Sequence, residues 1–200
     1  MKLKKLLVLL LMITTLIGSG SVNVYAKETV KTANASMLGS VARSNVNKSY
    51  TKADVRLLTA ITYCEAGYEG YKGKVAVANV ILNRVDSDVF DHVTSIRTAV
   101  YDLKRWGRQF SPAYVKTASG NYTTKGSLLE KALKLYTEEN YTSSLQKEMM
   151  EECERAAIEA LEGKNVIGDY LYFNAHINDT IKTCKKNNKP YTIIGGHIFY

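Results

Sequence analysis

The sequence has 200 residues, of which 27 are Lys or Arg and 19 are Asp or Glu, so its net charge is +8. Once the first 50 residues are set aside, the remaining length allows one domain with a substantial core. It is too short for two domains that each have such a core. The positive charges are scattered and accompany no recognised nucleic-acid-binding motif, so we expect no nucleic acid partner.

The first 26 residues have the three parts of a secretory signal peptide. Three lysines precede an apolar run from Leu6 to Ile17, and the sequence Val24-Tyr25-Ala26 fits a signal peptidase site. A retained membrane anchor is the less favoured alternative, because the apolar run is shorter than the roughly 18 residues of a spanning helix. We predict a secreted mature chain without a stable membrane span, in which loss of the three lysines lowers the net charge from +8 to about +5.

Residues 27–50 are rich in Ser, Asn, Thr, Lys and Val and show no sustained periodicity. This composition predicts a linker. Thr51 and Asp54 stand three apart just before an apolar-periodic run, which is a variant of the capping box that starts helices. We therefore expect one domain over residues 51–200.

The first predicted helix carries a carboxylate within its apolar stripe. Leu58, Ile61, Thr62 and Glu65 recur at spacings of three and four, so they share the face that a helix normally buries. Burial disfavours the charged form of a carboxylic acid and raises its pKa, as a general acid requires. The alternative is a solvent-exposed glutamate at a frayed helix end, since Gly67 predicts that the helix ends there.

A second carboxylate, Glu69, follows in a glycine-rich turn that allows both carboxylates to face one cleft. The next predicted helix, from Lys74 to Arg84, is apolar on nearly every side, which is typical of a central buried helix. Asn79 and Asn83 interrupt this pattern, and buried amides need hydrogen-bond partners. Those partners are either the carboxylate turn or loop backbone, and the sequence does not decide between them.

The middle of the chain alternates between helical and irregular patterns. Val93, Ile96 and Val100 predict a short helix, and residues 127–161 predict core helices. Between them, residues 104–120 lose the periodicity and predict a loop or short hairpin with several aromatic residues. Trp106 is a candidate for stacking on a sugar face, whereas we expect Phe110 to fill the core.

The C-terminal part has two β-rich pieces, at 170–173 and 191–200, separated by a segment rich in lysine and asparagine that we interpret as a turn. They predict a small two-stranded element that closes a cleft. His197 is expected to make a structural hydrogen bond.

The cysteines and histidines do not form a recognisable site. The three cysteines show no C-x-x-C spacing and the three histidines are scattered, so we expect no metal and no cofactor. Cys64 adjoins Glu65, but a cysteine nucleophile needs a paired histidine that nothing in the sequence places nearby.

Four motifs occur in an order that resembles the cell wall hydrolase family typified by the spore-cortex-lytic enzymes SleB and CwlJ. They are YCEAGYEGYKGKVAVANVILNRV at 63–85, QFSP at 109–112, LYFN at 171–174 and GGHIFY at 195–200. The resemblance covers the chain from about Leu57 to its C-terminus. It implies an α+β, mostly α, domain like those of lysozyme and lytic transglycosylases, with a small β-hairpin element.

The resemblance also implies roles for individual residues. Glu65 matches the glutamate that is taken as the family's catalytic acid. The other matching positions are expected to bind substrate or line the cleft, and they are Glu69, Asn83, Gln109, Ser111, Tyr172 and Asn174. Gln109 and Ser111 can hydrogen-bond sugar hydroxyl or acetamido groups. Ala175 stands where the family commonly has proline, which weakens the local backbone prediction.

The function that the resemblance implies is lysis of peptidoglycan glycan strands by a secreted, monomeric enzyme at the cell wall, whose anionic polymers would attract a basic protein. It favours a lytic transglycosylase that leaves 1,6-anhydromuramic acid ends. The alternatives are a muramidase with two carboxylates, an amidase that cuts the muramoyl-alanine link, and a wall-binding module without catalysis. The sequence leaves open whether the substrate is spore cortex or vegetative wall.

Overall fold

The computed structural model describes residues 49–104 and 107–200. The predicted signal peptide and residues 27–48 of the predicted linker lie outside the described residues, as does Trp106. None of the helices described is long and apolar enough to cross a membrane.

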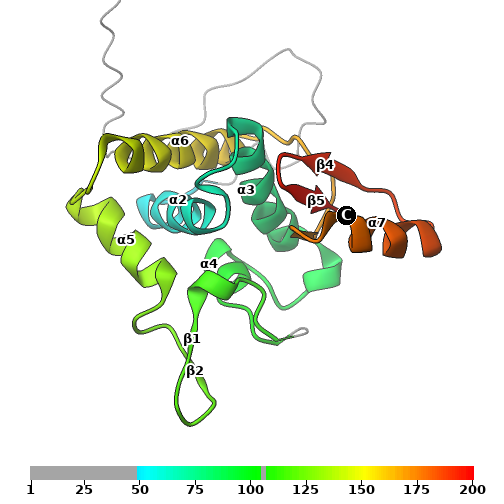
Figure 1. Cartoon of the computed structure of the whole chain (residues 1–200), viewed down its shortest axis with the longest axis horizontal. Helices are drawn as coiled ribbons and strands as arrows, with labels where there is room; N and C mark the ends of the chain where they lie inside the picture. Colours follow the sequence, from blue (N-terminus) through cyan, green and yellow to red (C-terminus); the bar gives the residue numbers. More distant parts are fainter. Residues whose placement is uncertain (1–48, 105–106) are drawn as a thin grey trace, which may run out of the picture.

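Helix α2 (Lys52–Ala66) lies at the centre of the domain, with α3 (Tyr71–Val85), α4 (Ile96–Val100), α5 (Leu128–Glu138) and α6 (Ser144–Leu161) around it (Figure 1). Its start confirms the predicted capping box. The Asp54 N–H donates to Thr51 Oγ1 at 3.2 Å, and the Thr51 N–H donates to Asp54 Oδ2 at 2.9 Å. These two bonds satisfy amide groups that a helix start leaves without partners.

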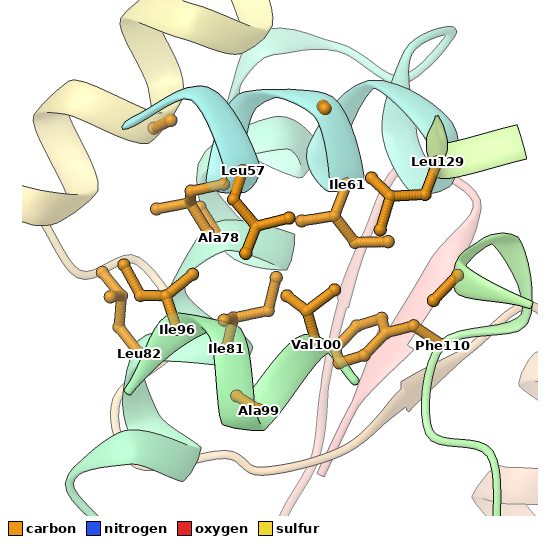
Figure 2. Packing of buried hydrophobic residues seen from close by; sticks show 14 of the residues in the cluster. Leu57, Ile61, Ala78, Ile81, Leu82, Ile96, Ala99, Val100, Phe110 and Leu129 are labelled. Atoms are coloured by element: carbon orange, nitrogen blue, oxygen red, sulfur yellow. The ribbon is translucent and has the colours of Figure 1, made fainter. Parts of the chain in front are cut away.

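Helix α3 is buried on nearly every side, as its sequence predicts. It packs against α2 and α6, and even Lys74 and Arg84 at its two ends are almost fully buried. Apolar side chains from α2, α3, α4 and α5 meet in one core with Phe110, which confirms the predicted place of that ring (Figure 2). Its largest members in that view are Leu57, Ile61, Ile81, Leu82, Ile96, Val100, Phe110 and Leu129.

The segment between α3 and α5 contains two short 3-10 helices, η1 (Asp88–Phe90) and η2 (Ser111–Ala113), and a short hairpin. In the hairpin, β1 (Val115–Lys116) pairs antiparallel with β2 (Tyr122–Thr123). This arrangement confirms the predicted loop or hairpin, and it places η2 against both α2 and α5.

The C-terminal part differs from the prediction in two ways. The predicted turn contains a helix, α7 (Ile177–Lys186), and the predicted two-stranded element has three strands. Strands β3 (Phe173–Asn174) and β4 (Thr192–Ile194) both pair antiparallel with β5 (His197–Phe199). The reason is that β5 offers hydrogen-bonding groups on both edges, and the local hairpin with β4 uses only one.

Together these elements make a mostly helical α+β domain, which confirms the predicted fold class apart from the number of strands in its sheet. The sheet packs on α3 through Ile194 and Phe199, in a second apolar cluster with Val77 and Val80. The C-terminal strands are thereby fixed beside the turn that joins α2 to α3.

Candidate active site

Glu65 lies in the last turn of α2, where the helix gives way to the 67–70 turn. The Gly67 N–H donates to the Tyr63 carbonyl at 3.0 Å. A Cβ on Gly67 would approach that same carbonyl oxygen to 2.6 Å, so only glycine fits here without a shift of the backbone. The turn therefore holds Glu65 at the end of a rigid helix rather than on a loose segment.

The Glu65 side chain is half-buried and lines a pocket of about 360 Å³. Three parts of the chain form this pocket: residues 63–69, residues 128–135 of α5 and the start of α6. Burial raises the pKa of Glu65 to about 7, against the opposing effect of the Arg84 charge, which lowers it. The carboxyl group is thus partly protonated at neutral pH, which agrees with the pKa direction expected from the helix pattern.

Glu69 also lines the pocket, but its carboxylate faces the turn between β4 and β5. The Gly196 N–H donates to Glu69 Oε2 at 3.0 Å, and His197 Nδ1 lies 3.7 Å from Glu69 Oε1. A Cβ on Gly195 would collide with Oε2, and one on Gly196 would come within 2.8 Å of Oε1. The two glycines are therefore required for the carboxylate to reach the backbone of the turn.

Lys74 holds the backbone of the 67–70 turn, which carries Glu69. Its ammonium donates to the Glu69 carbonyl at 2.8 Å and forms an ion pair with Glu152 of α6 at 2.6 Å. The Lys74 side chain is only 4% exposed, so its charge depends on these two partners. The turn that carries Glu69 is thus tied to both α6 and the C-terminal strands.

Arg84 is buried among three aromatic rings, and its charge acts on Glu65. Its guanidinium lies 5.0 Å from the ring centre of Phe90, 5.1 Å from that of Phe110 and 5.7 Å from that of Tyr172, and its Nε donates to the Leu171 carbonyl at 2.8 Å. Burial lowers its pKa to about 10, so it remains a cation at neutral pH. Its positive charge favours the ionised form of Glu65.

The thiol of Cys64 is not poised for nucleophilic attack. Burial, together with a smaller effect of the neighbouring Glu65 carboxylate, raises its pKa to about 12. Since the thiolate is the nucleophile, almost none of it exists at neutral pH. Glu65 is therefore the more reactive group of this adjacent pair.

A model of the cell wall hydrolase family matches residues 68–200, about two thirds of the chain. The chain belongs to the cell wall hydrolase family. The matched range starts three residues after Glu65 and includes Glu69.

The relatives of this chain include a spore cortex-lytic enzyme of Oceanobacillus iheyensis. The two are 42% identical over 75 residues, which cover 34% of this chain and 27% of that protein. The chain thus spans about a quarter of the length of that curated relative.

Two solved structures are also similar to it. The catalytic domain of the germination-specific lytic transglycosylase SleB from Bacillus anthracis has 24% identity and a TM-score of 0.44, over 75% of this chain and 95% of that one. The catalytic domain of Bacillus cereus SleB has 26% identity and a TM-score of 0.45, over 80% and 98%.

The two asparagines of α3 bind loop backbone, which is the second of the two alternatives for their partners. Asn83 Nδ2 donates to the Gly168 and Tyr170 carbonyls at 2.8 and 2.7 Å, and Asn79 bonds the backbone of residues 164 and 166. Both asparagines are buried next to residues 164–170, and their side chains hydrogen-bond backbone groups of that segment that water cannot reach. Asn83 is not among the residues that line the Glu65 pocket.

The remaining predicted site residues are also not among those that line the pocket. Tyr172 stacks on Tyr200 with 5.6 Å between ring centres, and Asn174 Oδ1 accepts from the His176 N–H at 2.8 Å, at the start of α7. Gln109 donates to the Gly107 carbonyl at 3.1 Å, and Ser111 is exposed as the first residue of η2. Of the predicted set, the structure brings only Glu65 and Glu69 together in one pocket.

The α5 and α6 wall of the pocket was not identified from the sequence. Lys131, Gln146 and Met149 belong to it, and they lie at least 66 residues beyond Glu65 in the chain. Their helices were recognised, but helical periodicity does not say which exposed face borders a site. Arg84 belonged to a recognised motif, and its place in an apolar helix was the signal that it has a buried role.

Proposed function

We propose that this protein cleaves the β-1,4 bond between N-acetylmuramic acid and N-acetylglucosamine in peptidoglycan and leaves 1,6-anhydromuramic acid ends. The observation that carries the proposal is a half-buried carboxyl group, Glu65, that lines a pocket and has its pKa raised to about 7. A positioned acid with that pKa can give up and take back a proton at neutral pH. Membership of the cell wall hydrolase family supports the same class of substrate.

In the first step Glu65 donates its proton to the glycosidic oxygen while the bond from muramic acid C1 to that oxygen breaks; the electron pair stays with the oxygen, and C1 becomes an oxocarbenium ion. N-acetylglucosamine leaves as an alcohol. In the second step the muramic acid 6-hydroxyl attacks C1, and Glu65, now a carboxylate, accepts the hydroxyl proton. Glu65 returns to its starting state and no water is consumed.

The contacts of Glu69 support this route over one with two catalytic carboxylates. A nucleophile or a base for water needs a carboxylate oxygen that faces the reacting carbon. Glu69 Oε2 instead accepts from Gly196, and Oε1 lies 3.7 Å from His197 Nδ1. We assign Glu69 a positioning role, in which it holds the β4–β5 turn beside the pocket.

The two other functions have weaker support. A zinc amidase needs a cluster of His and carboxylate ligands, and the described residues contain no group of three or more His, Cys, Asp or Glu able to hold a metal. A wall-binding module without catalysis has no need for a carboxyl group with a raised pKa in a pocket. A zymogram on peptidoglycan separates lysis from binding alone.

We propose further roles for the residues outside the pocket. Gln109 and Ser111, on a segment that packs against α2 and α5, contact sugar hydroxyl or acetamido groups. Asn83 and Asn174, whose polar groups bond neighbouring backbone, act by holding the segment that carries Tyr172.

We also propose a role for each part of the chain. Residues 1–26 direct export, and residues 27–50 form a linker before the catalytic domain. Residues 51–200 form that domain, which is monomeric and has no cofactor. The basic mature chain is held near anionic wall polymers by its charge.

The buried charge of Arg84 gives a test of the acid role through pH. Arg84 lowers the pKa of Glu65, so Arg84→Met is expected to raise it, while methionine still fills the space between the rings. Because the protonated form is the active acid, wild-type activity should fall as the pH rises through about 7. In the variant this fall should occur at higher pH, as measured by the rate of lysis between pH 5 and 9.

The matched control is Arg97→Met. It removes an exposed guanidinium that lies 5.2 Å from the ring centre of Tyr101. It should leave the profile unchanged. If the folded Arg84→Met variant lost activity over the same pH range as the wild type, that loss of activity would not be due to ionisation of Glu65.

A further inference from the structure

Tyr68 is the most exposed large hydrophobic side chain among the residues that the structure describes, at 91%. It nevertheless lines the pocket that contains Glu65, and so does Leu128, which is second at 61%. Single exposed aromatic rings are common on protein surfaces, but exposed apolar surface gathered in one pocket is typical of binding sites. The pocket therefore offers apolar surface that a ligand can cover.

The backbone on both sides of Tyr68 is held in place. The Glu69 N–H donates to the Ala66 carbonyl at 2.9 Å, so Tyr68 is a central residue of a tight turn that directly follows α2. On the other side, the Glu69 carbonyl accepts from Lys74 and the Glu69 carboxylate accepts from the Gly196 N–H. The turn thus restricts the position of the ring before a ligand binds, which lowers the cost of ordering it.

The place of Tyr68 in the pocket brings it close to the proposed chemistry. It follows Glu65 by three residues, and both side chains line the same pocket. In the proposed reaction Glu65 protonates the oxygen that joins two sugars, so those two sugars occupy the space around its carboxyl group. In β-1,4-linked N-acetylhexosamines the large substituents are equatorial, so the axial C–H groups make each face of the ring apolar. A tyrosine ring combines an apolar face with a polar tip, which suits this kind of ligand.

We propose that the ring of Tyr68 stacks on the apolar face of one of the two sugars that flank the cleaved bond, while its hydroxyl group stays in water. This inference rests on the proposed function and adds a residue that binds the glycan strand inside the pocket. The contact involves no charge and no proton, so it holds the bound substrate and the transition state alike. It therefore contributes to affinity rather than to the chemical step.

Loss of the ring should weaken binding of the strand and leave the chemical step nearly unchanged. Burial of one aromatic face favours binding about tenfold. In Tyr68→Ala, the substrate concentration that gives half the maximal rate should rise about tenfold, and the maximal rate should change less than about twofold. Tyr68→Phe should behave like the wild type, because it keeps the ring and loses only the hydroxyl group. Both variants should fold, since the side chain is almost fully exposed.

The experiment uses the full mature chain with purified sacculi from spores and from vegetative cells, and it follows the rate at which new glycan ends appear as the concentration of sacculi increases. A second measurement determines binding without turnover, as the fraction of Glu65→Gln protein that sediments with the sacculi in about 0.5 M salt. Salt at this concentration screens the attraction between a basic chain and anionic polymers, whereas stacking persists. Addition of Tyr68→Ala to Glu65→Gln should lower the affinity about tenfold.

The control is Tyr122→Ala, which removes a tyrosine ring that is 46% exposed on β2 and does not line the pocket. It should match the wild type in both measurements. Unchanged half-saturation and unchanged sedimentation in Tyr68→Ala would overturn the inference and leave the proposed function standing. So would a loss confined to the maximal rate, or an equal loss in Tyr68→Phe, which would indicate a hydrogen bond instead of stacking. Wild-type protein that releases glycan ends from neither kind of sacculus would overturn the proposed function itself.

Discussion

Replacement of Glu65 by glutamine is expected to abolish lysis while the domain stays folded. Glutamine has nearly the same shape, but its amide cannot donate the proton that the glycosidic oxygen needs. Loss of one positioned acid typically costs about 10² to 10⁴ in rate. The pocket offers no substitute, because the Glu69 carboxylate is bonded to the Gly196 N–H.

Turbidity clearing of purified sacculi measures this effect, with Glu148→Gln as the matched control. Glu148 is an exposed residue of α6 that lies outside the pocket, so its variant should clear sacculi like the wild type. Clearing by Glu65→Gln at the wild-type rate would rule out Glu65 as the acid.

Thermal unfolding at pH 8 tests whether the Glu65→Gln variant keeps its fold. The pKa of Glu65 is raised in the folded state, so folding binds protons, and stability is lost as the pH rises from the unfolded pKa through about 7. Glutamine has no charge to bury. The variant should therefore unfold at a temperature no lower than that of the wild type at pH 8.

Replacement of Glu69 by glutamine is expected to reduce activity by about tenfold rather than abolish it. The amide oxygen can still accept from Gly196, but the bond loses its charge, and charge-assisted hydrogen bonds are about twice as strong as neutral ones. The β4–β5 turn is then held less firmly. Catalysis continues, because an internal hydroxyl is already close to the reacting carbon and needs no activated water.

The measurement is the rate of appearance of new glycan ends, compared among wild type, Glu69→Gln and Glu65→Gln. Gly196→Ala provides a second variant at the same contact, since its Cβ would come within 2.8 Å of Glu69 Oε1. It should cause a loss similar to that of Glu69→Gln. A Glu69→Gln enzyme as inactive as Glu65→Gln would assign Glu69 a direct catalytic role.

The sequence predicted the elements whose signals are local. The capping box at Thr51, the buried stripe with Leu58 and Ile61, and the fully apolar α3 all follow from spacing within one helix. Phe110 was also placed in the core correctly.

Helix α7 was missed although a helical signal was present. Its inner face contains Ile177, Thr180, Ile181 and Cys184, at spacings typical of a helix. Many lysines and asparagines surround these four positions, and we interpreted that composition as a turn. The composition describes only the exposed face of the helix.

The contacts of the site could not be predicted, because they join distant parts of the chain. The bond from Gly196 to Glu69 spans 127 residues, and those from Asn83 to the loop span 85 and 87. The motifs indicated that these residues matter for the family. Which of them face the pocket depends on how α3, α6 and the C-terminal sheet pack together.

In the proposed mechanism Glu65 alone moves the protons, and the muramic acid 6-hydroxyl is the attacking group. Mass spectrometry of the fragments that the wild-type protein releases from purified sacculi tests this mechanism most directly. We expect muramic acid ends in the 1,6-anhydro form, each one water lighter than a hydrolysed end. Fragments that end in reducing muramic acid, with water added across the cleaved bond, would contradict it.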